Sequence, residues 1–290
     1  MDHVLLTRFN LPSVGVERIV RAKEGWLRDR VALFDRYCLP SVRAQTDRRS
    51  HWIVYLDPES PGWLKDGIAE RAADGTFTPI YRTAVSRDEL RADLRAVTGA
   101  GGAALLTTNL DNDDAIATDF VARLCGADTG GERTAVYLTQ GLIRQGDRLY
   151  LRTDRRNAFC SVREGWDDPV TCWADWHNLL GDRMAVRELG GEPAWLQVVH
   201  GMNVSNRVHG RRVAPAPYLA SFGGLLADLP APTPLELLAD VALDRPRRYL
   251  RESGRATVKR AVMAVTGKEG LERLKLRAAR SASPGARGSG

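Results

Sequence analysis

The segment AALLTTNLDNDDAI, residues 103–116, ends an apolar run with three carboxylates in four positions. The apolar part predicts a buried strand, and Asp111, Asp113 and Asp114 follow it directly. In an extended loop the side chains of Asp111 and Asp113 point the same way. Such a pair suits a divalent cation that prefers oxygen ligands, and without one the carboxylates would repel each other. The stretch therefore indicates a strand that ends in a cation site.

Two simpler interpretations remain open for these acids. Asp114 suits the N-cap of a helix whose buried side carries Ile116 and Phe120, and the other two acids suit a solvated loop. A calcium-binding EF-hand is excluded, because the sixth position from Asp111 is Ile116 instead of Gly and the twelfth is Ala122 instead of Glu.

Upstream, apolar strands alternate with amphipathic helices. Strands are expected at residues 4–7, 51–57 and 77–82, with Pro79 favouring a sheet edge for the third. Helices are expected at residues 22–38, 62–73 and 87–97, and we expect Pro40 to prevent the first from continuing. This alternation predicts a mostly parallel sheet covered by helices on both faces. Ligands bind beyond the carboxyl ends of such strands, where the loops at Asp57 and Asp111 lie.

The second half is more irregular. TAVYLTQGLIRQGDRLYLRT (134–153) reads as short strands with a turn at Gln145–Gly146–Asp147, and EPAWLQVVH (192–200) as a strand ending at His200. The stretch at 167–180 reads as a helix, and helices are expected from Thr233 onward.

Cysteines and the N-terminus bear on the compartment. Cys38, Cys125, Cys160 and Cys172 form no CxxC motif and are read as reduced thiols. The N-terminus MDHVLLTRFN has no signal-peptide pattern and no apolar run is long enough to cross a bilayer. We therefore expect a cytoplasmic location, with peripheral contact at the inner face of the membrane as an option.

The basic charge is concentrated at the C-terminus. Residues 241–290 hold 13 Lys and Arg against 4 Asp and Glu, whereas the whole chain holds 42 against 36. Basic residues alternate there with Leu, Val and Met, which suits an amphipathic helix on anionic lipid, nonspecific nucleic-acid binding, or a solvated helix pair packed on the body. We expect no nucleic-acid partner.

FDRYCLPSVRAQTDRRSHWIVYLDPESP (34–61) resembles the start of family 2-like glycosyltransferases of the GT-A fold. Ser41, Gln45 and Thr46 match a Ser-x-x-x-Gln-Thr stretch, Asp57 matches an Asp-containing turn, and LDNDD (110–114) matches a Leu-Asp-x-Asp-Asp stretch. With TRFNLP (7–12) and WLQVVHGMN (195–203), the set resembles the putative rhamnosyltransferase branch. The resemblance is strong over residues 1–125, thinner over 126–240 and absent beyond.

This resemblance implies a GT-A enzyme that uses a nucleoside-diphosphate sugar and Mn2+ or Mg2+. Asp57 would contact the nucleotide base, Asp111 the ribose and metal, and Asp113 the cation bridging the diphosphate. Late in several GT-A enzymes a His completes the metal shell, and His200 is the candidate here; a half-buried, hydrogen-bonded histidine is the alternative. The remaining nucleotide-pocket candidates follow the first strand: Thr7, Arg8 and Asn10.

The catalytic base is sought among acids of the second half. An inverting transferase needs a carboxylate to take the acceptor proton. The candidates are Glu164, Asp167, Asp168 and Asp175, and we expect the base to be Asp168 or Asp175. Asp168 also suits a turn, and Asp175 also suits a solvent-facing position. Side chains proposed for acceptor binding are Trp166, Trp173 and His177.

The division expected from these patterns has four parts. A nucleotide-sugar-binding half spans residues 1–125, an acceptor-binding half 126–232, a basic helical extension 233–280 and a disordered tail 281–290. The function expected is metal-dependent transfer of a sugar to a glycan or glycolipid acceptor. A nucleotidyltransferase that makes the activated sugar is one alternative, although TRFNLPSVG (7–15) has little Gly for a phosphate loop. The other is a noncatalytic glycan-binding protein.

Overall fold

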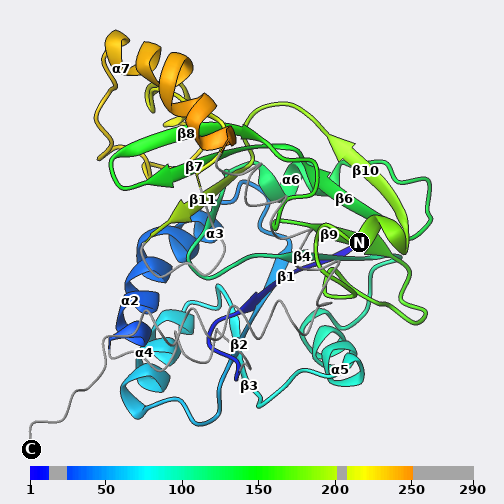
Figure 1. Ribbon diagram of the computed structural model, residues 1–290. Helices are drawn as coiled ribbons and strands as arrows, with labels where there is room; N and C mark the ends of the chain where they lie inside the picture. The colour runs from blue at the N-terminus through cyan, green and yellow to red at the C-terminus, as the bar shows by residue number, and fades with distance from the viewer. Residues whose placement is uncertain (13–24, 201–207, 251–290) are drawn as a thin grey trace, which may run out of the picture.

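A seven-stranded sheet forms the centre of the protein in the computed structural model, which describes residues 1–12, 25–200 and 208–250. The strand order is β10-β6-β9-β4-β1-β2-β3 (Figure 1). Within these described strands, only β9 runs antiparallel to its neighbours. The strands are β1 (Asp2–Arg8), β2 (Ser50–Leu56), β3 (Thr78–Tyr81), β4 (Leu105–Asn109), β6 (Thr134–Leu138), β9 (Ser161–Glu164) and β10 (Ala185–Leu189). The predicted α/β class with a mostly parallel sheet is confirmed, and β3 with its Pro79 lies at the expected edge.

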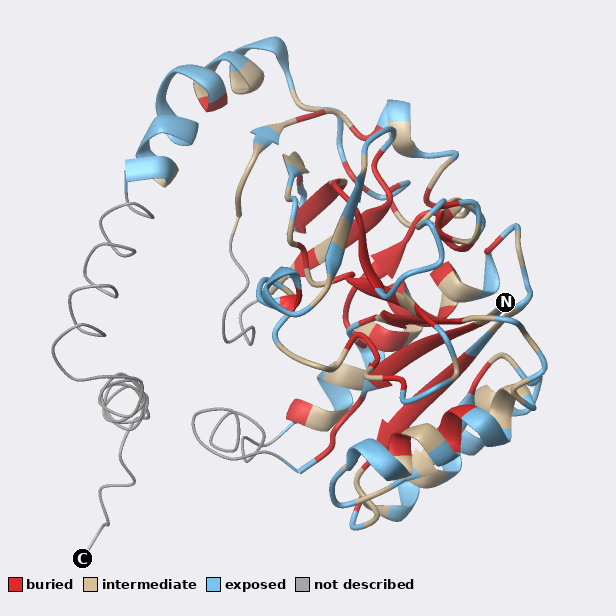
Figure 2. Cartoon of the chain, turned by 90° about the vertical axis from the view of Figure 1, so that its right-hand side faces the viewer, coloured by how far each residue is buried: buried red, intermediate tan, exposed pale blue. Residues whose placement is uncertain are grey.

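Helices cover both faces of this sheet. Alternate residues of one strand serve opposite faces, so Leu5 packs in a cluster with α2 and α4, while Val4 packs in a second cluster with α5. The sheet interior is buried throughout (Figure 2). The helices are α2 (Trp26–Leu33), α4 (Gly62–Ala72), α5 (Arg87–Thr98) and α6 (Phe120–Cys125).

A second, five-stranded sheet lies beside the first, in the order β12-β8-β7-β11-β5. The predicted hairpin is present, with β7 and β8 antiparallel and Gly146 in the turn at φ +58°. The predicted strand before His200 is β11, and it pairs with β5, immediately after the acidic loop. The strands are β5 (Ala115–Ile116), β7 (Gln140–Gln145), β8 (Arg148–Thr153), β11 (Trp195–Val199) and β12 (Arg211–Arg212). This second sheet therefore brings His200 toward the acids.

The prediction that the first helix could not continue at Pro40 is wrong. A π-helical turn, η1 (Phe34–Cys38), follows α2 directly, and α3 (Leu39–Arg43) continues from it. The Leu39 N–H bonds back to the Phe34 carbonyl across this wider turn. Because the turn is widened directly before Pro40, the proline ring is accommodated within the helical run. The start expected at residue 22 lies outside the described residues.

Hydrogen bonds join the end of α3 to the chain that follows the acidic loop; we call those of Gln45 the Gln45 staple. Gln45 Nε2 donates to the carbonyl of Ala117 at 2.7 Å, and Gln45 Oε1 accepts from the N–H of Val121 in α6 at 3.0 Å. Thr46 adds a backbone N–H bond of 2.9 Å to the carbonyl of Thr118. These bonds satisfy backbone groups that regular secondary structure leaves open there.

The helix predicted at residues 167–180 is wrong. This stretch forms turns, because the Glu164 carboxylate accepts from the N–H groups of Val170 at 3.0 Å and Thr171 at 2.8 Å. Asp168 and Thr171 have φ of +52° and +69°, which no α-helix accommodates. The regular structure here is confined to the short 3-10 turn η2 (Leu180–Asp182).

The helix expected from Thr233 is confirmed over the described part. A short 3-10 turn η3 (Ala216–Tyr218) precedes α7 (Pro234–Ala239), which begins with a capping box between Thr233 and Glu236. The π-helical turn η4 (Asp240–Asp244) follows, and the run stays helical to residue 250. Figure 1 shows it projecting from the body beside the second sheet. The rest of the predicted extension and the predicted disordered tail lie outside the described residues.

Candidate functional site

The acidic loop is fixed to the carboxyl ends of the central strands. The Leu110 N–H donates to the Leu6 carbonyl at 3.0 Å, and the Thr7 hydroxyl donates to the Leu110 carbonyl at 2.7 Å. Further along, Asn112 Nδ2 donates to the Phe9 carbonyl at 2.9 Å. The loop is therefore held against the end of β1, and its three aspartates enter three different environments.

Asp113 is buried and carries two partners on one oxygen. Its Oδ2 lies 2.6 Å from a terminal nitrogen (Nη1) of Arg30 and 2.9 Å from His200 Nε2, with the carboxylate 5% exposed. Burial alone opposes ionisation, but the hydrogen bond from His200 and the charge of Arg30 outweigh it and lower the pKa of Asp113. The predicted proximity of Asp113 and His200 is thus present, although 87 residues separate them.

Asp114 does not cap a helix. The next helix, α6, begins at Phe120 with Asp119 at its N-cap position, and Asp114 precedes strand β5 instead. Its Oδ1 accepts from the Val198 N–H at 2.8 Å, while the buried Oδ2 has no partner among the described residues. Burial, followed by the charges of Asp113 and Asp111, raises the pKa of Asp114 well above its usual value. Asp114 therefore ties the loop to β11.

Asp111 faces outward from the same loop. Protein packed around its remaining sides desolvates the carboxylate, and this effect first and Asp113 second raise the pKa to about 6. Asn109 Nδ2 approaches Asp111 Oδ1 at 3.4 Å, and the charges of Arg30 and Arg8 act in the opposite direction on its pKa. Of the three acids, Asp111 is the one that offers its carboxylate to a ligand from solvent.

The first two strand ends supply a polar rim with a structural layer beneath it. Thr7 is completely buried and accepts a 2.9 Å hydrogen bond from Trp52 Nε1, so this residue, expected in the nucleotide pocket, has no surface to offer a ligand. Asn10 accepts from the Asp57 N–H at 3.1 Å and donates to Ser60 Oγ at 2.9 Å. Asp57 accepts from the Glu59 N–H at 2.8 Å within its own turn. Asn10 and Asp57 thus lie together, although Asn10 is buried and both polar atoms of its side chain are already hydrogen-bonded.

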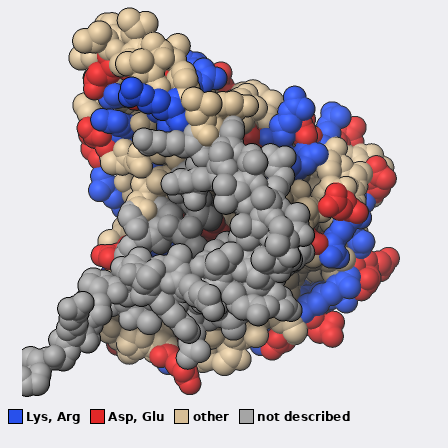
Figure 3. All heavy atoms as spheres, viewed as in Figure 1, with Lys and Arg blue, Asp and Glu red and all other residues tan. Residues whose placement is uncertain are grey.

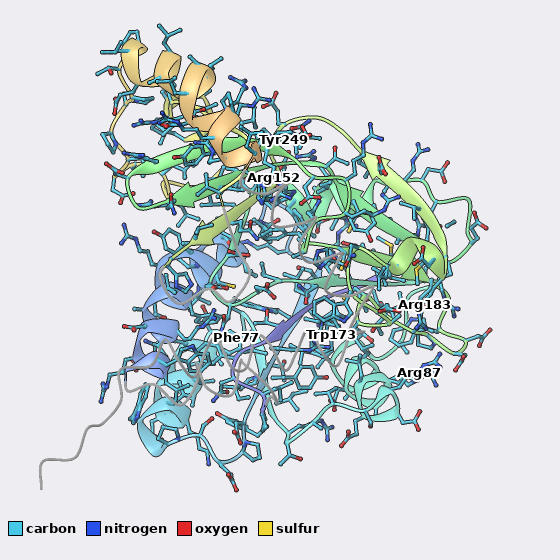
Figure 4. All side chains as sticks on the ribbon, viewed as in Figure 1. Phe77, Arg87, Arg152, Trp173, Arg183 and Tyr249 are labelled. Carbon is cyan, nitrogen blue, oxygen red and sulfur yellow. The ribbon has the colours of Figure 1, made fainter. Side chains whose placement is uncertain are left out.

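Arg8 lies on the face of Trp173. The guanidinium carbon is 4.1 Å from the ring centroid, and the ring also packs against Tyr55 at 5.7 Å. Trp173 Nε1 donates to Asn109 Oδ1 at 2.8 Å, which fixes the ring at the end of β4. Figure 4 shows Trp173 near the middle of the molecule and Arg87 to its right, at α5. Trp173, expected as an acceptor platform, therefore has Arg8 on one face.

The candidate bases are separated by the path of the chain. Residues 165–169 leave β9 at the amino end of β4, and residues 170–173 return along β4, where the Cys172 N–H bonds to Thr107 Oγ1 at 2.9 Å. Asp168 stays on the outside, paired with Arg87 and Arg91 of α5, which lower its pKa. Asp175 follows Trp173 toward the carboxyl ends and accepts from Arg183 Nε at 2.7 Å. Asp175 therefore lies two residues after Trp173, which is hydrogen-bonded to Asn109 at the end of β4.

The other candidates of the second half are bonded elsewhere or face solvent. Glu164 is buried and paired with Arg133 at 2.7 Å, and Asp167 is exposed beside Asp168. Trp166 Nε1 donates to Asp2 Oδ2 at 2.9 Å, at the start of β1. Trp166 therefore lies at the amino ends of the strands, whereas the acids follow their carboxyl ends. The His177 carbonyl accepts from the Tyr137 hydroxyl, and burial lowers the pKa of the imidazole.

The donor set fits a divalent cation only after a rearrangement. Two carboxylates and an imidazole are suitable ligand types, and Asp113 and His200 are already in contact. Within the described residues, however, no group of three His, Cys, Asp or Glu side chains is arranged to hold a metal ion. Arg30 contacts Asp113 Oδ2, one of the two oxygens of that carboxylate. The residues that would hold a cation here are Asp111, Asp113 and His200.

Sequence reasoning missed Arg30, Asn109 and Asn112. Arg30 Nη1 also donates to Asn112 Oδ1 at 3.0 Å, and Asn109 links Trp173 to the loop. Nothing in the helical pattern of residues 22–38 distinguishes Arg30 from its neighbours Arg28 and Arg36. The two asparagines stand inside or directly before the acidic motif, so their position was the available signal.

Comparison with known proteins places the chain in a protein family. A family model described as "Putative rhamnosyl transferase" matches residues 2–212. No curated protein matches the chain. Among solved structures, residues 1–349 of S. aureus TarS in complex with UDP-GlcNAc are 9% identical with a TM-score of 0.46, and the match covers 71% of this chain but only 62% of that one. The inositol-1-phosphate CTP transferase from T. maritima is 8% identical with a TM-score of 0.38, covering 80% and 98% of the two chains.

Proposed function

The chain belongs to the putative rhamnosyl transferase family, a family of glycosyltransferases, and from this premise we propose that it moves a sugar from a nucleoside-diphosphate sugar to a hydroxyl of a glycan or lipid-linked acceptor. Mn2+ or Mg2+ is the proposed cofactor. The observation that carries the proposal is the contact between Asp113 and His200, which two different sheets bring together at the carboxyl ends of the central strands.

The donor is proposed to bind along the rim formed by the first two strand ends. Asn10 and Asp57 are adjacent there and suit the nucleoside. Arg8, held on Trp173, supplies a positive charge next to Asp111, where the diphosphate is expected. A bound cation supplies further positive charge to the leaving diphosphate. Asp111, Asp113 and His200 are the ligands proposed for it.

Asp175 is the base that we propose for the acceptor hydroxyl. Its neighbour Trp173 is bonded to the end of β4, so the backbone of this segment is fixed beside the rim. Arg183 Nε lies 2.7 Å from Asp175 Oδ2 and holds the carboxylate in place. Asp168 is not the base that we propose, because its two arginine partners hold it against α5.

A turnover assay tests the proposal. The purified chain is incubated with a panel of nucleotide sugars and Mn2+, Mg2+ or EDTA, and release of nucleoside diphosphate is measured. Asp113→Asn should abolish release, whereas Asp119→Asn, a nearby partly exposed acid, should retain it. Pyrophosphate release from a nucleoside triphosphate and a sugar phosphate would instead support a nucleotidyltransferase. Binding of glycans without turnover of any nucleotide sugar would support the noncatalytic alternative.

The C-terminal helix is proposed to bring the enzyme to an anionic membrane surface. Within the described parts of the chain, no helix has both the length and the apolar character to cross a membrane. The helical run after Thr233 nevertheless exposes several large apolar side chains: Leu235, Leu238, Val241, Leu243, Tyr249 and Leu250. Figure 3 shows basic side chains, with some acidic ones, beside uncharged residues on this projection. Apolar contact combined with basic charge is the pattern of helices that lie in the interface of anionic lipid.

Vesicle sedimentation tests the membrane proposal. The full chain should pellet with vesicles containing phosphatidylserine, and much less with vesicles of phosphatidylcholine alone. Leu238→Glu should weaken this binding, because it places a charge on the exposed apolar side of the helix, while Leu219→Glu, an exposed position elsewhere, should not. Equal binding of the chain and both variants would refute it.

A further inference from the structure

Arg30 occupies the position of a counterion to Asp113. It reaches the loop from α2, and its Nη1 contacts Asp113 Oδ2 at 2.6 Å and Asn112 Oδ1 at 3.0 Å. Asp113 is 5% exposed and Arg30 is 15% exposed, so water screens the pair weakly. A buried carboxylate needs such a partner, because an unpaired charge in the interior is costly. Arg30 therefore stabilises this arrangement of the acidic loop.

The same contact is incompatible with a cation on that oxygen. A guanidinium and a divalent cation at one carboxylate oxygen would repel each other at close range, and little solvent lies between them. A cation on Asp113 Oδ2 would therefore compete with Arg30 for that oxygen.

The displaced guanidinium has donors to spare. Arg30 Nε is buried and donates to none of the described residues, so only part of the planar donor set is used. The guanidinium also lies 5.3 Å from the ring of Trp26, at the start of the same helix. A guanidinium matches the geometry of phosphate oxygens and binds them with two parallel hydrogen bonds. A diphosphate beside the cation would give Arg30 a new anionic partner.

We propose that Arg30 is a placeholder for the cation. Its guanidinium pairs with Asp113 when no cation is bound, and it moves to the donor diphosphate when the cation binds. The inference rests on the proposed function, because it assumes a nucleotide-sugar site at Asp111 and Asp113. It makes the binding of cation and diphosphate cooperative: the cation alone must break the Arg30–Asp113 pair, whereas with the diphosphate present the guanidinium gains a replacement partner.

Mn2+ binding without nucleotide tests the placeholder. The affinities of the full chain and its variants are measured by electron paramagnetic resonance of free Mn2+. Arg30→Gln keeps a hydrogen-bonding side chain but removes the charge, and should tighten Mn2+ binding at least about tenfold, a typical size for coupled sites. Arg28→Gln is the matched control, with the same charge change two residues away on an exposed position, and should leave the affinity within about twofold. Arg30→Lys, which keeps the charge, should stay close to the unmodified chain.

The second arm measures binding of UDP and dTDP at saturating Mn2+. Arg30→Gln should weaken the binding of whichever nucleotide the unmodified chain takes, while Arg28→Gln should not. An Mn2+ affinity that Arg30→Gln leaves unchanged or lowers would overturn the proposal, and so would a lack of Mn2+ binding by both chains. Failure of this inference can be distinguished from failure of the proposed function. Sugar-nucleotide turnover that persists in EDTA would support the transferase, but it would exclude both the bound cation and the role proposed for Arg30.

Discussion

Acidification should destabilise the protein through a histidine remote from the acidic loop. His3 lies within β1, is 1% exposed, and its Nε2 is 2.8 Å from Thr108 Oγ1, which in turn contacts Ser161 Oγ at 2.8 Å. Burial, opposed by the weaker effect of Asp47, lowers the pKa of His3 from 6.5 to about 3. The folded protein therefore keeps this imidazole neutral at a pH where the unfolded chain takes up a proton.

The sign and size of the effect follow from that difference. Between the folded pKa of about 3 and the unfolded value of 6.5, the unfolded state binds more protons, so stability is retained above pH 6.5 and lost as the pH falls below it. Each pH unit in this window costs about 1.4 kcal/mol. Lowering the pH from 7 to 5 should therefore remove about 2 kcal/mol of the free energy of unfolding through His3 alone.

Urea unfolding at pH 7 and pH 5 measures the effect, with His3→Gln as the comparison because Gln retains a polar group toward Thr108. Other groups titrate in this range, so the quantity of interest is the difference between the two chains. The original chain should lose about 2 kcal/mol more than His3→Gln on acidification. The exposed His51→Gln should behave like the original chain. Equal losses in the original chain and His3→Gln would refute the reasoning.

Two further changes test the packing that supports the site. Gly141→Ala in β7 would place its Cβ 2.0 Å from the Trp195 ring, whose Nε1 is fixed by a hydrogen bond, so we expect a loss of about 2–3 kcal/mol in urea unfolding. Gly101→Ala, with open space around it, should cost far less, and similar losses for both would contradict this account. Asp228→Asn should cost about 1–2 kcal/mol in the same assay, because it removes the anionic partner of Arg144, which is 6% exposed. An unchanged midpoint would show that the Leu225 carbonyl is sufficient for that guanidinium.

The order of strands and helices in the first half was predictable, because each element there carries its own periodic pattern. β1, β2, β4 and α5 lie where apolar runs and helical spacing place them. The helical run through Pro40 was not predictable, because it depends on a π-helical turn whose hydrogen bond to Phe34 has no known sequence signal. The stretch at 167–180 has helical spacing. The backbone N–H groups of Val170 and Thr171 nevertheless bond to the Glu164 carboxylate, and the chain forms turns there instead of a helix.

The acidic site was predictable in part. The spacing of Asp111 and Asp113 placed both in one loop after β4, and the position of His200 after an apolar strand marked it as a strand end. Which side chains meet across the fold was not visible in the sequence. Arg30 approaches Asp113 from a helix 83 positions earlier, and Arg8 depends on a Trp held by Asn109. Such contacts arise from the packing of the two sheets and α2, and no local pattern specifies them.

The Gln45 staple changes what the family motif reports. Gln45 and Thr46 belong to the stretch by which the resemblance was recognised, yet their side chains bond to the backbone around α6 and contact none of the three acids. These hydrogen bonds do not involve Asp113, so a chain that lost Asp113 could keep them. A match to the stretch around Gln45 therefore indicates a shared fold. A search for active relatives should ask separately whether the three acids, His200 and Arg30 are present.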